Sequence, residues 1–185
     1  MIYEIRFHGR GGQGVITAAI FLAEAAVFEG LWSQAIPFFG AERRGAPVVA
    51  FTRISDKPIR IYSQIYNPDA IVVLDEKLLQ LKSILQGLKS NGIIVVNSSG
   101  KLKLPKISSQ RIFTVNATSI ALKLGLVVAG WPVVNTAMLG AIVRALNIIS
   151  IESIEECIRR KWRGEIGEKN SLAARSAYEN VRERE

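Results

Sequence analysis

Short apolar runs alternate with segments of helical periodicity along most of this sequence. Apolar side chains at every second position, or in a short unbroken run, are typical of strands, whereas apolar positions three or four residues apart are typical of helices. This pattern predicts strands over residues 2–8, 31–36, 47–54, 59–65, 70–75, 93–99 and 111–117. It predicts helices over residues 15–30, 76–90, 118–125 and 133–147, and two charged amphipathic helices after residue 150, separated near Gly164 and Gly167.

Turn-forming residues divide some of these elements. Residues 55–58, Ser-Asp-Lys-Pro, separate two predicted strands, 47–54 and 59–65, which are therefore expected to form an antiparallel hairpin. Since neither a repeat nor a low-complexity linker interrupts the alternation, residues 1–185 are expected to form a single α/β domain. The predicted fold is a three-layer α/β/α sandwich around a mixed sheet, with C-terminal helices over residues 150–185. The last helix is expected to project and pack on a partner.

Composition is that of a globular protein and argues against several kinds of site. Hydrophobic residues make up 49% of the chain and charged residues 22%, which suits a folded domain with a core. Cys157 is the only cysteine and His8 the only histidine. An internal disulfide, an all-cysteine metal cluster, a histidine zinc site and a histidine-containing triad are therefore disfavoured. Cys157 is expected to be an unreactive packing residue.

One uncharged stretch, residues 124–143, raises the question of a membrane span. Gly130 and Pro132 interrupt it, so two buried elements are expected instead of one span. The N-terminal residues contain Glu4 and Arg6 and lack the apolar segment of a signal peptide. We therefore expect a cytoplasmic protein that has no contact with a membrane.

The net charge of +8 is unevenly distributed. Between residues 93 and 147 the chain has no acidic residue and six basic ones, namely Lys101, Lys103, Lys106, Arg111, Lys123 and Arg144. Such a region suits nucleic acid, an acidic subunit or a phosphorylated cofactor, or it is a solvated basic face. A nucleic-acid partner is disfavoured because no aromatic residues are interleaved with the basic ones.

Four glycines fall within residues 9–14, Gly-Arg-Gly-Gly-Gln-Gly, between the first predicted strand and the first predicted helix. Gly9, Gly11 and Gly14 match the dinucleotide fingerprint G-x-G-x-x-G, a Rossmann-like loop in which glycines let a phosphate approach backbone amides at a helix N-terminus. A P-loop is excluded because Val15 and Ile16 stand where Lys and Ser or Thr are required. The alternative is a glycine turn that only packs the helix on the strand.

The residues after the second predicted strand favour a phosphate over a bare ribose. No Asp or Glu ends that strand, although an acidic residue is expected there in an NAD site. Arg43 and Arg44 follow instead, and their forked guanidinium groups suit a phosphate. An interface ion pair, for example with Glu42, is the alternative. A stand-alone NADP-binding reductase is one hypothesis from these residues, although no general acid stands out for hydride transfer.

Four stretches together resemble one known family: FHGRGGQGVITAA at 7–19, GAERRGAPVVAFTRIS at 40–55, NPDAIVVLDEKLL at 67–79 and PVVNTAMLGA at 132–141. The chain is similar to the gamma-subunit family of 2-oxoacid:ferredoxin oxidoreductases, and in particular to gamma subunits of pyruvate:ferredoxin oxidoreductase. The resemblance runs from about Tyr3 to Leu146 and continues more loosely over residues 168–179. The ERRGAP motif favours pyruvate over indolepyruvate or 2-oxoglutarate.

This resemblance implies a role inside a larger enzyme. Such complexes oxidatively decarboxylate a 2-oxoacid on thiamine diphosphate, pass electrons through iron–sulfur clusters to ferredoxin and release acyl-CoA; the reverse reaction is that of a pyruvate synthase. Thiamine diphosphate, magnesium and [4Fe-4S] clusters are then expected on the partner alpha, beta and delta subunits. The gamma chain is expected to be a non-catalytic accessory subunit that packs on these partners and helps to accommodate coenzyme A (CoA).

Candidate CoA contacts follow from combining the resemblance with the residues. Backbone amides of the glycine loop, with Arg10, would meet the diphosphate, and the two arginines the phosphates, including the adenosine 3′-phosphate. The candidates are Gly9, Arg10, Gly11, Gly12, Gln13, Gly14, Arg43 and Arg44. Gln13 either bonds across the loop or caps the helix, and Asn135 is expected to cap a helix. Four aromatic residues suit stacking on adenine, but packing is expected for most of them: Trp32, Phe38, Phe39 and Trp131.

Overall fold

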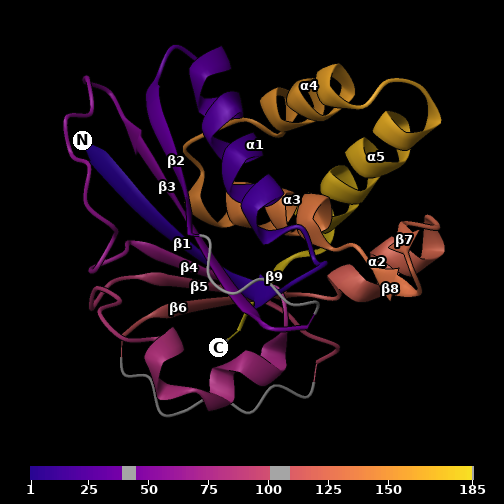
Figure 1. Cartoon of the computed structure of the whole chain (residues 1–185), viewed down its shortest axis with the longest axis horizontal. Helices are drawn as coiled ribbons and strands as arrows, with labels where there is room; N and C mark the ends of the chain where they lie inside the picture. Colours follow the sequence, from indigo (N-terminus) through magenta and orange to yellow (C-terminus); the bar gives the residue numbers. More distant parts are fainter. Residues whose placement is uncertain (39–44, 101–108, 185) are drawn as a thin grey trace.

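The computed structural model describes residues 1–38, 45–100 and 109–184 (Figure 1). Its centre is a seven-stranded mixed sheet with the strand order β2-β3-β1-β4-β5-β6-β9. The strands are β1 (Ile2–Arg10), β2 (Trp32–Phe38), β3 (Pro47–Ser55), β4 (Ala70–Val73), β5 (Ile93–Asn97), β6 (Arg111–Val115) and β9 (Arg182–Arg184). Neighbours among β1, β4, β5 and β6 pair in parallel, and β2, β3 and β9 join as antiparallel strands.

Four helices lie on one side of the sheet, which we call the helical face (Figure 1). They are α1 (Val15–Phe28), α3 (Asn135–Leu146), α4 (Ile151–Lys161) and α5 (Glu165–Asn180), and the shorter α2 (Ala117–Lys123) follows β6. Helices α1 and α3 pack on the strands, and α4 and α5 pack on these two helices. Ile5 and Phe7 of β1 are fully buried in the core beneath them. The predicted α/β fold with a mixed sheet is thus confirmed, and these helices lie close to their predicted positions.

The expectation that the last helix projects from the molecule is wrong. Its residues Ala173, Ala174 and Ala177 are fully buried. A Cβ atom added to Gly140 of α3 would lie 1.9 Å from the carbonyl oxygen of Ala174, so the two helix backbones approach closely. The small residues on both helices allow this approach, and α5 therefore completes the core of its own chain.

The opposite face of the sheet is covered by a thinner layer. Two 3₁₀ helices, η1 (Glu76–Gln80) and η2 (Lys82–Ile84), stand where one helix over residues 76–90 was predicted. Leu78, Leu79 and Ile84 pack on apolar residues of β4 and β5. The continuous helix is interrupted at Leu81, whose backbone is extended. The buried Arg6 side chain binds the segment after it, donating through Nη2 to the carbonyl oxygens of Ile84 at 3.0 Å and Gln86 at 2.7 Å.

The predicted hairpin between residues 47–54 and 59–65 is also wrong. β3 has β1 on one side and β2 on the other, both antiparallel, so neither edge is left for residues 59–65. The carbonyls of Ile61 and Gln64 instead accept hydrogen bonds from the buried Arg53 at 3.4 and 3.2 Å. Strand β9, which pairs with β6, was not predicted because all three of its residues are charged.

Residues 124–143 form two elements, as the interrupted pattern predicted. The first is a two-stranded hairpin of β7 (Val127–Val128) and β8 (Trp131–Pro132), and the second is the first part of α3. The hairpin is not buried, since Val128 and Trp131 are more than half exposed. Within residues 1–38, 45–100 and 109–184, none of the helices has the length and apolar character needed to cross a membrane.

Candidate functional site

The candidate site lies where the order of strands reverses direction. From β1 the chain goes to β2 and β3 on one side and returns to β4 on the other. In open α/β sheets, ligands bind in the crevice outside the carboxyl ends of the strands at such a reversal. The glycine loop leaves β1 at this point, and Leu74 and Asp75 follow β4 beside it, with Leu74 N donating to the carbonyl of His8 at 2.8 Å.

Two glycines of the loop are required by close packing. A Cβ atom at Gly9 would lie 2.5 Å from Val15 Cγ2, and one at Gly14 would lie 2.4 Å from Asn135 Nδ2. Gly14 also has a φ of 79°, and Gly12 a φ of 98° with no atom within 4 Å of an added Cβ. Gly9 and Gly14 therefore allow close packing against Val15 of α1 and Asn135 of α3, whereas Gly12 faces open space.

Several backbone amides of the loop are already bonded within the chain. Arg10 N donates to Gln13 Oε1 at 2.7 Å, Gly11 N to the carbonyl of Ala46 at 2.9 Å, and Gln13 N to the carbonyl of Arg10 at 3.0 Å. Gln13 thus bonds across the loop. Helix α1 begins after Gly14 without a side-chain cap, so the positive end of its dipole lies at the end of this loop.

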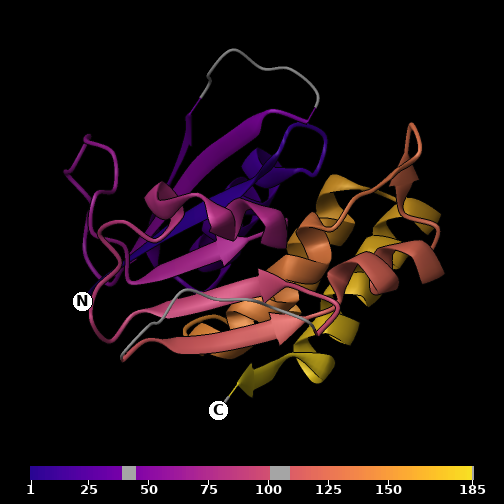
Figure 2. The ribbon, with the colours of Figure 1, turned by 90° about the horizontal axis from the view of Figure 1, so that it is seen from below.

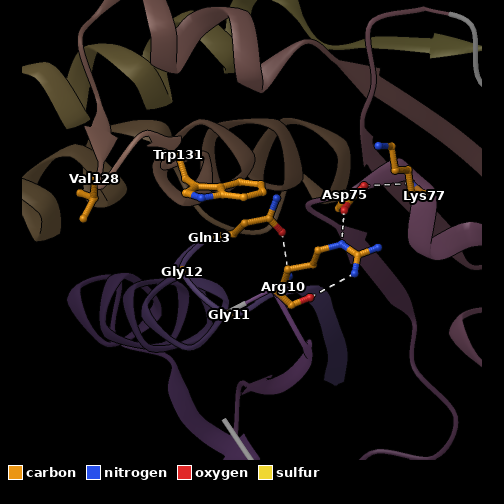
Figure 3. A pocket seen from close by; sticks show the side chains of 9 residues that line it. Arg10, Gly11, Gly12, Gln13, Asp75, Lys77, Val128 and Trp131 are labelled. Atoms are coloured by element: carbon orange, nitrogen blue, oxygen red, sulfur yellow. Dashed lines mark hydrogen bonds and ion pairs between the residues drawn. The ribbon is translucent and has the colours of Figure 1, made fainter. Parts of the chain in front are cut away.

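A cavity of about 180 Å³ opens in front of this loop (Figure 3). Its lining comes from the loop, from the start of η1 and from the β7–β8 hairpin: Arg10, Gly11, Gly12, Gln13, Gly45, Asp75, Lys77, Val128 and Trp131. Arg10 forms an ion pair with Asp75 (Nε–Oδ2, 2.5 Å) and donates through Nη1 to the carbonyl of Gly45 at 3.1 Å. The Trp131 ring lies across the cavity near Gln13 (Figure 3).

A larger polar cleft of about 620 Å³ adjoins the cavity and shares Gln13, Asp75, Lys77 and Trp131 with it. Its polar lining follows the carboxyl ends of β5 and β6: Asn97, Ser98, Ser99, Asn116, Thr118, Ser119 and Lys123. Asn97 Nδ2 donates to the carbonyl of Leu74 and to Thr118 Oγ1, both at 2.9 Å. We did not predict these residues. In the sequence they could have been recognised by the polar residues at the ends of two apolar strands, β5 and β6.

The other predicted residues have different outcomes. Arg43, Arg44 and Phe39 lie outside the described residues. Trp32 and Phe38, expected mainly to pack, are 52% and 46% exposed on β2 and do not line the cavity. The expectation that Asn135 caps a helix is wrong, because Val134 is the N-cap position of α3 and no side chain caps the helix. Asn135 is the first residue of α3; its Oδ1 accepts a hydrogen bond from Thr136 N at 2.9 Å, and its side chain packs on Gly14.

The lone cysteine and histidine are both buried and both uncharged. Burial, with the neighbouring Glu24 carboxylate, raises the pKa of Cys157 to about 12. Its Sγ donates to Glu24 Oε2 at 3.2 Å, which agrees with a packing role. Burial and the Arg6 guanidinium lower the pKa of His8 to about 3. Neutral His8 accepts a hydrogen bond from Arg6 Nε at 3.0 Å.

The described residues do not include a group of side chains of the kind that holds a metal ion. In the part of the chain that the structure describes, no three or more His, Cys, Asp or Glu side chains come together as metal ligands would. A [4Fe-4S] cluster is held by four thiolates, and the whole sequence has one cysteine.

Comparison with known proteins gives a consistent result. A family model described as pyruvate ferredoxin/flavodoxin oxidoreductase matches residues 4–180. The common gamma subunit of the pyruvate/ketoisovalerate oxidoreductases of Pyrococcus furiosus is 54% identical over 182 residues, 96% of each chain. The pyruvate synthase subunit PorC of Methanothermobacter thermautotrophicus is 51% identical over 178 residues, 96% of this chain and 95% of its own. The crystal structure of the pyruvate oxidoreductase subunit PORC of Thermotoga maritima is 38% identical, with a TM-score of 0.84 over 100% of this chain and 99% of that one.

Proposed function

Because the chain belongs to the pyruvate ferredoxin/flavodoxin oxidoreductase family, we propose that it is the gamma subunit of a pyruvate:ferredoxin oxidoreductase. The complex would oxidatively decarboxylate pyruvate to acetyl-CoA and CO₂ and reduce ferredoxin. The observation that carries this proposal is the 54% identity to a gamma subunit across 96% of both chains. The relatives do not support the stand-alone NADP-binding reductase. Since that gamma subunit is common to pyruvate and ketoisovalerate enzymes, the choice of 2-oxoacid is assigned to other subunits.

The chain's own role in this proposal is accessory. Thiamine diphosphate, its magnesium ion and the [4Fe-4S] clusters would be bound by alpha, beta and delta subunits. This assignment is supported by the single, protonated cysteine and by the lack of a metal-ligand group among the described residues. This chain would help to assemble the complex and would form part of the CoA site, but it would supply no catalytic group.

We assign the CoA contact to the cavity in front of the glycine loop. Asp75 and the carbonyl of Gly45 engage Nε and Nη1 of Arg10, and Nη2 has no hydrogen-bond partner among the described residues. We assign this Nη2 to a phosphate oxygen. The first-turn amides of α1 lie next to the same loop, and anions bind at such helix N-termini. Trp131, 56% exposed on its hairpin, has the ring needed to stack on adenine. Arg43 and Arg44 remain proposed contacts for the CoA phosphates.

Co-purification tests the proposed subunit role. The tagged chain, expressed in its native cells, is expected to co-purify with subunits that contain iron–sulfur clusters and thiamine diphosphate. The purified complex is expected to reduce ferredoxin or a viologen dye with pyruvate and CoA, whereas the isolated chain has no such activity. Turnover by the isolated chain, or purification without those subunits, would contradict the proposal.

Steady-state kinetics of the complex test the CoA contact. A charge-assisted hydrogen bond contributes about 1.5–3 kcal/mol, or about 10- to 150-fold in affinity. Arg43→Ala and Arg44→Ala, separately, and Trp131→Ala are expected to raise the KM for CoA while the KM for pyruvate stays unchanged. Each variant's KM for CoA is compared with its KM for 3′-dephospho-CoA; an arginine that binds the 3′-phosphate is identified by a loss of this difference on substitution. Leu172→Ala, an exposed residue of α5, is the control; equal KM values for CoA in all variants would exclude this site.

A further inference from the structure

Residues 57–66, Lys-Pro-Ile-Arg-Ile-Tyr-Ser-Gln-Ile-Tyr, form a loop with unusually exposed aromatic side chains, which we call the tyrosine loop. Tyr62 is 87% exposed, Tyr66 68% and Ile61 43%. The loop lies beside the N-terminus, at the end of the molecule away from the β7–β8 hairpin and the candidate CoA cavity (Figures 1 and 2). Tyrosine and arginine are enriched at the centres of protein interfaces, so this composition points to a protein contact.

The loop is held in one conformation by buried groups. The Arg53 side chain, 1% exposed, donates to the carbonyls of Ile61 and Gln64 and is itself paired with Glu4 at 2.8 Å. Ile65 is 2% exposed and anchors the loop from within. After it, the backbone of Tyr66 packs so closely on Gly87 that an added Cβ there would lie 2.1 Å from the Tyr66 carbonyl oxygen. A preformed loop binds with less loss of conformational entropy than a flexible one.

The charge of the loop selects the partner. It contains Lys57 and Arg60 and no acidic residue. Neither cation forms an ion pair with any of the residues that the structure describes. A second copy of this chain is disfavoured, because a two-fold contact would bring the same positive charges together. Nucleic acid is disfavoured by the aliphatic surface of Pro58 and Ile61, which suits protein side chains better than a phosphate backbone.

We infer that the tyrosine loop is the anchor by which this chain docks on an acidic, partly apolar surface of another subunit of its complex, an inference that rests on the proposed function. Tyr62 and Tyr66 insert into that surface, and Lys57 and Arg60 meet its carboxylates. The contact lies at the opposite end of the molecule from the CoA cavity, so the two roles use separate surfaces.

Quantitative assembly of the complex tests this inference. The full chain carrying Tyr62→Ala and Tyr66→Ala together, or Arg60→Glu, is mixed with the remaining subunits, and binding is followed by size-exclusion chromatography and native mass spectrometry. Loss of two anchoring tyrosines is expected to weaken association at least about 30-fold. Arg60→Glu is expected to slow association and to reduce its dependence on salt. Leu172→Ala is again the matched control, and it should assemble like the wild type.

The outcomes separate the two proposals. If the wild type does not assemble with cluster-containing subunits, the proposed function and the loop inference both fail. If the wild type assembles and the tyrosine double variant assembles equally well, only the loop inference fails. Melting temperatures of the isolated chains serve as the folding control, since exposed side chains are expected to change them little. Loop-dependent binding of the isolated chain to poly(U) RNA, or loop-dependent dimers, would overturn the assignment to an acidic protein surface.

Discussion

The two faces of strand β1 are built on opposite principles. The helical face of β1 has the side chains of Ile5 and Phe7 and the hydrogen-only position Gly9. There apolar side chains and close backbone contacts hold the helices. The alternating residues Arg6, His8 and Arg10 point to the opposite face. There Arg6 donates to His8 and to the carbonyls of Ile84 and Gln86, and Arg10 bonds to Asp75 and to the carbonyl of Gly45. At β1, one face is therefore held by hydrophobic burial and the other mainly by polar side chains that bond irregular backbone, whereas at β4 and β5 the opposite face also has an apolar cluster with Leu78, Leu79 and Ile84.

Strand β3 repeats this contrast with consecutive residues. Thr52 points to the helical face, where its Oγ1 donates to the carbonyl of Ala19 at 2.8 Å. Arg53 points to the opposite face and holds Glu4, Gln34 and the tyrosine loop. Around β1 and β3, regular helices therefore cover the face that is stabilised mainly by hydrophobic burial, which has no preferred direction. On the other face, hydrogen bonds from a few buried arginines determine the conformation of irregular segments.

Removal of the Arg53 side chain is expected to have the largest effect on stability. In Arg53→Met, Glu4 and Gln34 lose their partner, and the carbonyls of Ile61 and Gln64 lose their side-chain donor. Removing one partner of a buried ion pair costs about 3–5 kcal/mol; in this pair the arginine is 1% exposed and the glutamate 20%. Urea unfolding at neutral pH measures this loss. Arg60→Met on the exposed loop, where Arg60 has no ion pair among the described residues, is the matched control and should change stability by less than about 0.5 kcal/mol. Equal losses of unfolding free energy in the two variants would show that the hydrogen bonds and ion pair of Arg53 do not stabilise the fold.

This contrast also explains where prediction from sequence succeeded. Helices 15–30, 133–147 and those after residue 150 cover the helical face, where apolar periodicity determines both the element and its position. Residues 59–65 and 76–90 have equally clear patterns, but the carbonyls of Ile61 and Ile84 bond to arginines whose burial no local pattern reveals. For the site, the motif predicted a glycine loop between the first strand and the first helix, where the structure has it. Asn97 and Asn116, in contrast, become neighbours only through the parallel order of their strands.

The close contacts of the helical face give the second largest expected effect. Gly14→Ala puts a Cβ atom within 2.4 Å of Asn135 Nδ2 at a φ of 79°. Left-handed backbone costs a non-glycine residue about 1–2 kcal/mol, and overpacking adds about 1–3 kcal/mol. Gly12→Ala is the matched control, because its φ is also positive but nothing lies within 4 Å; it should cost only the backbone contribution. Thermal or urea unfolding of both variants tests this, and equal losses would show that contact with α3 is unimportant.

His8, on the opposite face, is expected to make the stability of the fold depend on pH. The pKa of His8 is lowered from 6.5 to about 3 by burial and the Arg6 guanidinium. Between these pH values the unfolded chain binds a proton at His8 and the native chain does not, so stability falls as pH falls, by about 1.4 kcal/mol per pH unit. His8→Gln keeps an acceptor for Arg6 but does not titrate. Since carboxylates contribute equally to both proteins, the difference between their pH–stability curves isolates His8; parallel curves would contradict the assignment.

The smallest expected effect belongs to Thr52, the neighbour of Arg53 on the other face. Thr52→Val is nearly isosteric and removes one neutral hydrogen bond, whose net contribution to stability is about 0.5–1.5 kcal/mol. The acceptor, the carbonyl of Ala19, lies within α1 and keeps its helical hydrogen bond, and the added methyl group is buried at a fully buried position. We therefore expect a loss near the lower end of that range, several times smaller than for Arg53→Met. Urea unfolding of the two variants under one set of conditions gives the ratio directly. A ratio near one would mean that directional bonds stabilise both faces alike, and the contrast between the two faces would then lose its energetic basis.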